Sequence, residues 1–160
     1  MKKTELLKNF VSQYDWGQDY ALPLYRIARR HSGKKALDIG TGWGISSYAF
    51  YLAGYDVITI DVEYKQVPEG ITFVQGDVKD VLLSLKDRQF DLIYIDSGHS
   101  YEEVKRDFEL VSYHDLLTDG GIIIFDDYAN CDGVKRFIDE LDYPKKFIKN
   151  KNKTCVVAIR

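Results

Sequence analysis

Short apolar runs, each ending at or beside an acidic residue, recur along the middle of the chain and constrain the fold more than any other feature. They cover residues 35–39, 56–60, 71–75, 91–95 and 122–125. Stretches with helical spacing of apolar residues follow them, which is the pattern of parallel strands joined by crossover helices. We therefore expect an α/β fold of the Rossmann-like type, with a doubly wound and mostly parallel sheet.

The carboxyl-terminal part of the chain predicts a hairpin. Residues 146–149 and 154–159 are two further strand-like runs, and the polar residues 150–153 between them are typical of a turn. The expected sheet therefore has seven strands and ends with an antiparallel hairpin strand.

The first 30 residues predict a short helical cap. Apolar spacing favours helices over residues 6–14 and 22–30, with Pro23 in the first turn of the second helix. We expect residues 1–160 to form a single domain. A cap this short implies an open pocket or one that a second subunit completes, so a homodimer is one expectation.

Size, composition and charge exclude several classes of protein. A chain of 160 residues fits one domain, and it holds no apolar run of about 18 residues that could span a bilayer. Thr4, Glu5, Lys8 and Asn9 interrupt the apolar run that a secretory signal needs, so we expect a cytoplasmic protein. The net charge of −3 offers no general attraction to phosphate backbones, which disfavours nucleic-acid partners. Cys131 and Cys155 are too few for a disulfide scaffold.

A glycine-rich turn follows the first predicted strand. Gly40, Gly42 and Gly44 allow the backbone to turn tightly and to approach a ligand closely. In an open parallel sheet the ligand crevice lies at the carboxyl ends of the strands, which is where this turn falls. The dinucleotide fingerprint requires Gly or Ala three residues after its second glycine, but Ile45 occupies that position. A nicotinamide-dependent oxidoreductase is therefore a minor alternative.

The segment from Asp38 to Gly44 resembles the acidic-x-Gly-x-Gly-x-Gly loop of class I methyltransferases that use S-adenosylmethionine (SAM). The resemblance implies that this loop holds the methionine part of SAM. The residues concerned are Asp38, Gly40, Thr41, Gly42, Trp43 and Gly44.

Two further strand ends supply expected cofactor contacts. Asp61 ends the second strand 21 residues after Gly40, where a carboxylate can accept hydrogen bonds from ribose hydroxyls, and Val62 follows it. The resemblance places Gly76, Asp77 and Val78 beside the adenine, and Asp96 is a further candidate contact. The alternative for each aspartate is a solvated strand end or a helix cap.

Residues 95–104 and 120–128 resemble the small-molecule O-methyltransferases, both the catechol type and the macrolide or sugar type. In the catechol type a magnesium ion is held at positions that correspond to Asp96, Asp126 and Asp127. Neighbouring strand ends converge, and three carboxylates in one place would repel each other unless a hard divalent cation neutralised them. The resemblance therefore implies Mg²⁺ as a second cofactor.

His99 is the expected general base, acting beside Asp96. Catechol-type enzymes carry a lysine at this position, whereas the macrolide type often has Asp-x-x-His, as in Asp96 to His99. The alternative is that His99 caps a helix or orients a ligand. Asp127 replaces the usual asparagine, which weakens the correspondence with the catechol type. Glu102 and Glu103 are expected at the start of a helix, where they favour its dipole.

These observations predict methyl transfer from SAM to a hydroxyl of a small-molecule or sugar-like acceptor. A methyltransferase acting on protein or nucleic acid is one alternative. The residues after the fourth strand lack the Asn/Asp-Pro-Pro-Tyr/Phe tetrapeptide of enzymes that methylate amino groups of bases. A SAM-binding module without catalytic activity is another. Four aromatic residues near the amino terminus are expected either to line an acceptor platform or to pack in the core: Tyr14, Trp16, Tyr20 and Tyr25.

Overall fold

The computed structural model describes residues 2–15, 17–31, 33–149 and 154–159, with side chains described as far as Ile148. The elements in chain order are α1 (Lys3–Val11), α2 (Gly17–His31), β1 (Lys35–Ile39), α3 (Ile45–Ala53), β2 (Asp56–Asp61), β3 (Thr72–Gln75), α4 (Val78–Ser84), β4 (Phe90–Ile95), α5 (Tyr101–Tyr113), β5 (Leu117–Phe125), α6 (Asp132–Glu140), β6 (Lys145–Lys149) and β7 (Thr154–Ile159).

The strands form one sheet in the order β3-β2-β1-β4-β5-β7-β6. Strands β3, β2, β1, β4 and β5 are parallel, which confirms the predicted Rossmann-like α/β arrangement. Strand β7 pairs antiparallel with β5, and β6 pairs antiparallel with β7. The predicted turn at 150–153 lies outside the described residues. The strand order reverses direction between β1 and β4, the point at which open α/β sheets bind ligands.

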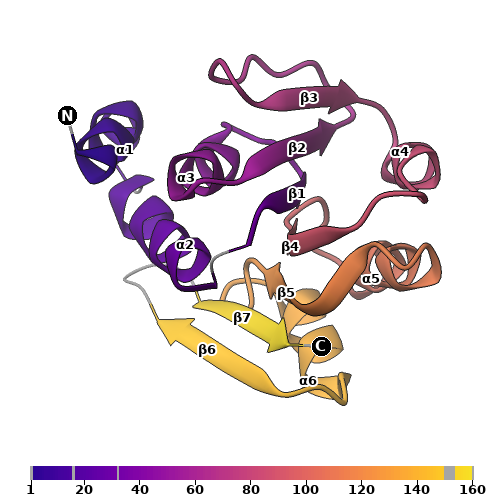
Figure 1. Ribbon diagram of the computed structural model, residues 1–160. Coiled ribbons are helices and arrows are strands. Elements are labelled where there is room, and N and C mark those ends of the chain that lie inside the picture. Colours follow the sequence, from indigo (N-terminus) through magenta and orange to yellow (C-terminus); the bar gives the residue numbers. More distant parts are fainter. Residues whose placement is uncertain (1, 16, 32, 150–153, 160) are drawn as a thin grey trace.

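Helices cover both faces of the sheet: α1, α2 and α3 lie on one face and α4, α5 and α6 on the other (Figure 1). Alternate residues of each central strand point to opposite faces, so the sheet has two cores. In β1, Ala36 packs under α1 to α3 while Leu37 packs under α4 to α6. The near-continuous apolar runs in the sequence follow from this burial on both faces.

The amino-terminal helices differ in extent from the prediction. Helix α1 begins at Lys3 because the Glu5 carboxylate accepts the Lys2 amide at 3.0 Å. Helix α2 begins at Gly17, so Pro23 is its seventh residue, and the expectation of a first-turn proline is wrong. Proline removes one helical hydrogen bond. Packing of the buried residues Tyr20, Ala21, Leu24 and Ala28 offsets that loss.

Two connections around β3 also differ from the sequence pattern. No helix joins β2 to β3; residues 62–71, which include Pro68 and Gly70, form an irregular loop instead. The general pattern predicted a helix after each run, but it gave no bounds for α4, which follows β3. The side chain of Asp77 caps it by accepting the Lys79 amide at 2.9 Å, and its apolar face packs in the core. The spacing of Val78, Val81 and Leu82 after an aspartate was the available signal.

Strand β5 is longer than the predicted 122–125. It starts at Leu117 and includes Asp119 to Gly121. Gly120 has φ +76°, and the pairing with β4 shifts register between Phe90 and Leu92. The glycines therefore form an irregularity within the strand.

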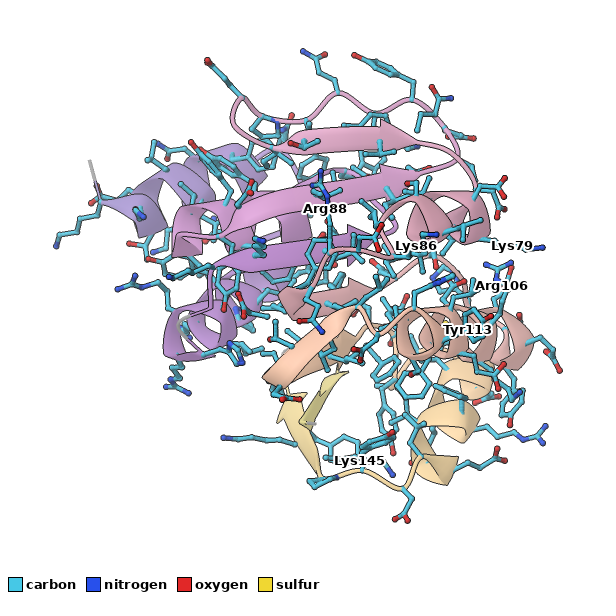
Figure 2. The ribbon with its side chains drawn as sticks, turned by 45° about the vertical axis from the view of Figure 1, so that its right-hand side comes forward. Lys79, Lys86, Arg88, Arg106, Tyr113 and Lys145 are labelled. Atoms are coloured by element: carbon cyan, nitrogen blue, oxygen red, sulfur yellow. The ribbon has the colours of Figure 1, made fainter. Side chains whose placement is uncertain are left out.

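Among the described residues, every helix is too short or too polar to cross a bilayer. Figure 2 shows the side of the molecule formed by α4 and α5, with Lys79 on α4 and Arg106 and Tyr113 on α5. Lys86 and Arg88 lie in the loop after α4, and Lys145 begins β6. The labelled cations thus come from separate elements rather than from one basic helix.

Candidate active site

The loop from Gly40 to Gly44 is held on the end of β2. The Gly40 and Thr41 amides both donate to the Ile60 carbonyl at 3.0 Å. The Thr41 and Thr59 hydroxyls are 2.7 Å apart, and the Asp61 carboxylate accepts the Gly42 amide at 3.1 Å. The predicted cofactor loop is therefore a fixed turn whose shape depends on its neighbour strand.

Gly40 brings this loop against the end of β4. Its φ is +103°, and a Cβ at this position would lie 2.4 Å from the Asp96 carbonyl oxygen. The Asp96 amide donates to the Ile39 carbonyl at 2.8 Å, so the two strand ends are in direct contact. Only glycine allows this approach, which places the glycine-rich loop and Asp96 in one crevice.

Asp38 lies beneath the loop and is fully buried. Its Oδ2 accepts hydrogen bonds from the hydroxyls of Ser46, Ser47 and Thr59. Its Oδ1 is buried and has no hydrogen-bond partner. Burial raises the pKa of Asp38 to about 7, while the hydrogen bonds from Ser47, Ser46 and Thr59 oppose the rise. An unsatisfied buried acceptor is costly, and a cationic donor would relieve that cost.

The raised pKa of Asp38 predicts that the ligand-free protein loses stability as the pH rises. The folded-state pKa of about 7 exceeds the roughly 3.9 of an unfolded aspartate, so between these values the folded state holds a proton that the unfolded state has released. The free energy of unfolding therefore falls from about pH 4 to about pH 7, by at most roughly 4 kcal/mol. Denaturant titrations at several pH values should show this fall in the wild type and a smaller one in Asp38→Asn.

Asp56, which is exposed at the start of β2, offers the matched control. Asp56→Asn should keep the wild-type fall in stability with pH. An Asp38→Asn protein whose stability depends on pH as strongly as the wild type would contradict the assignment.

The residues expected around ribose and adenine occupy neighbouring loops. Both oxygens of Asp61 accept backbone amides, Oδ2 from Gly42 at 3.1 Å and Oδ1 from Glu63 at 3.0 Å. Val62 is 62% exposed, whereas Val78, the first residue of α4, is buried in the core. The Gly76 amide donates to the Asp61 carbonyl at 3.0 Å, which holds these two loops together. Asp77 is exposed and caps α4.

A tyrosine from the amino-terminal cap reaches Asp96. The Tyr20 hydroxyl, on α2, lies 3.4 Å from Asp96 Oδ2 and forms a short hydrogen bond with the Tyr94 hydroxyl on β4. Both tyrosines are buried. The sequence offered Tyr20 only as one of several aromatic candidates, because spacing does not show which side chain of a helix meets a distant strand end.

A buried aspartate that the sequence did not single out braces the loop after β4. Asp107, on α5, is fully buried and accepts a short hydrogen bond from the Ser97 hydroxyl. Its other oxygen lies 2.7 Å from the Arg106 guanidinium. Burial raises the pKa of Asp107, and the bonds to Ser97 and Arg106 oppose the rise. The hydrogen bond to Asp107 therefore fixes Ser97, the residue that follows Asp96.

His99 and Asp127 form a pair across the crevice. His99 Nε2 lies 3.0 Å from Asp127 Oδ2, and the side-chain amide of Asn130 donates from Nδ2 to Asp127 Oδ1 at 3.0 Å. The His99 side chain is 62% exposed, while that of Asp127 is 10% exposed. Asp127 has φ +55°, a strained value for a residue that is not glycine. Glu103 forms the capping box of α5 with Ser100, in agreement with its expected place at the helix start.

One cavity of about 270 Å³ joins the two halves of the predicted site. Its lining comes from the glycine-rich loop and the start of α3 on one side and from the ends of β4 and β5 on the other. The lining residues are Tyr20, Thr41, Gly42, Trp43, Ile45, Ser46, Asp96, His99 and Asp127. Carboxylate oxygens of Asp96, Asp126 and Asp127 lie within 4.8 Å of one another, as the expected metal ligands should.

Comparison with known families identifies the family and supports the fold. The profile of a family described as a methyltransferase domain matches residues 37–128, more than half of the chain. The chain belongs to this methyltransferase family. The matched segment contains the glycine-rich loop, Asp61, Asp96 and the pair Asp126–Asp127, but not α1 or α2.

Solved structures with the fold of this methyltransferase cover nearly all of the chain. An O-methyltransferase from Bacillus cereus, in complex with S-adenosylhomocysteine (SAH), has a TM-score of 0.72 at 16% identity, over 100% of this chain and 91% of its own. TomG from Streptomyces achromogenes, an O-methyltransferase involved in tomaymycin synthesis, was solved with SAM and has a TM-score of 0.68 at 17% identity, over 99% and 90%.

A methyltransferase from Podospora anserina with bound SAH has a TM-score of 0.70 at 15% identity, over 99% of this chain and 88% of its own. No curated protein matches the sequence significantly. The methyltransferase fold therefore extends to α1 and α2, beyond the segment that matches the family profile.

Proposed function

We propose that this methyltransferase transfers a methyl group from SAM to a hydroxyl of a small-molecule acceptor, acting as a single domain. The observation that carries the proposal is the cavity that the glycine-rich loop shares with Asp96, His99 and Asp127. A methyl donor and an acceptor hydroxyl must meet in one place, and this cavity offers a cofactor loop and a proton acceptor side by side. Three neighbours in fold were solved with SAH or SAM, which supports the cofactor assignment.

The residues beneath and around the loop fit the charges of SAM. The unpartnered Oδ1 of Asp38 is an acceptor suited to the ammonium of the methionine part. Asp61 has oxygens for ribose hydroxyls, and exposed Val62 offers an apolar surface to the adenine. When bound, SAM supplies a methyl group on a positively charged sulfur, so the protein mainly has to position the acceptor and remove its proton.

We assign His99 as the general base and Asp127 as the residue that orients it. If Nε2 donates to Asp127, the lone pair on Nδ1 is left to take the proton of the acceptor hydroxyl. Asn130 holds the other oxygen of Asp127 and so fixes the carboxylate. In this proposal Asp127 therefore orients the general base, whereas the sequence resemblance implied only metal binding for this residue.

A hard divalent ion such as Mg²⁺ also fits the site. Asp126 and Asp127 are buried beside Asp96, and three neighbouring carboxylates favour a cation with oxygen ligands. Such an ion would bind the acceptor oxygen and lower its pKa. Tyr20, which approaches Asp96 Oδ2, would help to hold that carboxylate in place.

The acceptor is expected to be small and partly apolar. Trp43 is 65% exposed and stacks at a tilt on Tyr14 with ring centroids 5.5 Å apart, which gives one wall of the cavity an aromatic surface. With Tyr20 it favours a hydroxylated aromatic or sugar ring over a chain of nucleic acid. Two alternative functions are tested against methylation of a small-molecule hydroxyl: methyl transfer to protein, and SAM binding without catalysis.

Calorimetric titration with SAH and, separately, with NAD tests the cofactor assignment. We expect SAH to bind at micromolar concentrations and NAD to give no heat. Each titration is repeated with Mg²⁺ and with a chelator, and a heat that depends on Mg²⁺ should disappear in Asp126→Ala. Catechols and sugars are then screened as acceptors by the mass gain of one methyl group.

The outcomes separate the alternatives. If neither SAH nor NAD binds, the Asp38–Gly44 loop is a structural turn and the proposal fails. If SAH binds and proteins are methylated while the small hydroxyl compounds are not, the acceptor class is wrong. If SAH binds and nothing is methylated, the chain is a SAM-binding module.

A further inference from the structure

Three chemically different metal ligands converge at the rim of the cavity. They are the imidazole of His99, the carboxylate of Asp127 and the thiol of Cys131, and one ligand atom from each lies within 4.8 Å of the other two. They come from two segments: His99 from the loop after β4, and Asp127 and Cys131 from the connection between β5 and α6. The sequence pattern alone assigns Cys131 no binding role.

The backbone at the start of α6 lies very close to the loop that carries His99. A Cβ on Gly133, in the first turn of α6, would lie 2.5 Å from the Tyr101 amide nitrogen and 3.0 Å from the His99 carbonyl oxygen. The missing side chain therefore lets the start of α6 lie directly against the loop that carries His99. The Cys131 amide donates to the Asp127 carbonyl at 3.0 Å, which fixes the third ligand beside the second.

The donor set differs in kind from the neighbouring cluster of carboxylates. Imidazole nitrogen, carboxylate oxygen and thiolate sulfur favour borderline ions such as Zn²⁺ and Co²⁺, whereas oxygen ligands alone favour Mg²⁺. Ligand atoms around a tetrahedral zinc lie roughly 3.3 to 3.8 Å apart, as its bond lengths of about 2.0 to 2.3 Å require. Atoms within 4.8 Å of one another reach that spacing with side-chain shifts of about 1 Å.

We propose that His99, Asp127 and Cys131 form a binding site for a borderline divalent metal ion such as Zn²⁺. On binding, the Cys131 thiol loses its proton to solvent, and His99 presents the nitrogen that now faces Asp127. Three protein ligands leave a fourth position for water, and the exposed His99 gives the ion access from solvent. Asn130, which holds the second oxygen of Asp127, supplies the outer support that metal-binding carboxylates need.

The proposal has a consequence for catalysis, and that consequence alone rests on the proposed function. An ion at this site occupies His99 and Asp127, the proposed base and its partner. Zn²⁺ should therefore inhibit methyl transfer, and the inhibition should be relieved in Cys131→Ser.

Titration of the full chain with Co²⁺ tests the site without any acceptor. A thiolate ligand gives a charge-transfer absorption band in the near ultraviolet, and tetrahedral Co²⁺ gives intense visible bands. We expect both in the wild type, loss of the charge-transfer band in Cys131→Ser, and Zn²⁺ affinity at least about 100-fold weaker in that variant. Cys155→Ser, which changes the chain's other cysteine, and Asp126→Asn, which disrupts the carboxylate cluster, should keep the band.

Absence of the band in the wild type, or its persistence in Cys131→Ser, overturns the proposal. Calorimetry with SAH on the same preparations separates this result from the proposed function. SAH binding without a cobalt–thiolate band removes the metal site alone, and a band without SAH binding removes the methyltransferase proposal alone.

Discussion

Replacing His99 with glutamine is expected to slow methyl transfer by about 100- to 10,000-fold, the usual contribution of a general base. The glutamine amide can still donate to Asp127, but it has no nitrogen that accepts a proton. The turnover number should therefore fall while the affinity for SAH stays within about threefold of the wild type. Steady-state rates with the acceptor identified by the screen, together with SAH calorimetry, provide the measurement.

His114→Gln is the matched control, because His114 follows α5 and packs its ring against Tyr113 rather than against the cavity. It should leave the rate unchanged. A His99→Gln protein that turns over at the wild-type rate would exclude His99 as the base. A parallel loss of SAH affinity would instead indicate that His99 shapes the cofactor site.

Gly40→Ala is expected to weaken SAH binding by at least about 100-fold, because a misplacement of about 1 Å in a binding group costs this much. The added Cβ would lie 2.4 Å from the Asp96 carbonyl oxygen, and φ is +103°. The loop and the end of β4 must then separate. SAH calorimetry and thermal unfolding followed by circular dichroism measure the two effects.

Comparison with Gly54→Ala separates the effect of the steric clash at Gly40 from the effect of backbone strain. Its φ is +109°, close to that of Gly40, but a Cβ there would meet nothing within 4 Å. Gly54→Ala should lower Tm by about 2 to 8 °C through strain alone and should leave SAH affinity unchanged. Gly40→Ala should lower Tm by at least about 5 °C more. Equal effects of the two variants on Tm and on SAH binding would show that the contact with Asp96 is unimportant.

The sequence predicted the parts of the site that depend on local pattern. Apolar runs that end in aspartate indicate parallel strand ends, so Asp38, Asp61 and Asp96 fall where the pattern places them. The parallel sheet follows from the same runs, because burial on both faces requires them. The pattern gave no bounds for the short helix α4, so the sequence offered a helix cap only as a general alternative for Asp77.

The parts that were not predicted depend on contacts between distant segments. Nothing in local spacing shows that Tyr20 reaches Asp96, that Ser97 bonds to Asp107, or that Cys131 lies beside His99. The pairing of His99 with Asp127 likewise required the strand order and the left-handed backbone of Asp127. Such contacts arise from packing, which composition and periodicity do not encode residue by residue.

The contact between Tyr20 and Asp96 joins two parts of the chain at the site: α2 and the segment that matches the family profile. The floor of the cavity, from the glycine-rich loop to Asp127, belongs to the segment shared with the family, whereas Tyr20 comes from a helix outside that segment. A change at Tyr20 would therefore act on the site through its contacts with Asp96 and Tyr94, while the residues of the family segment stay the same. Tyr20→Phe would remove the contact with Asp96 and leave every residue of the family segment unchanged, so it would measure what the amino-terminal helices contribute to the site.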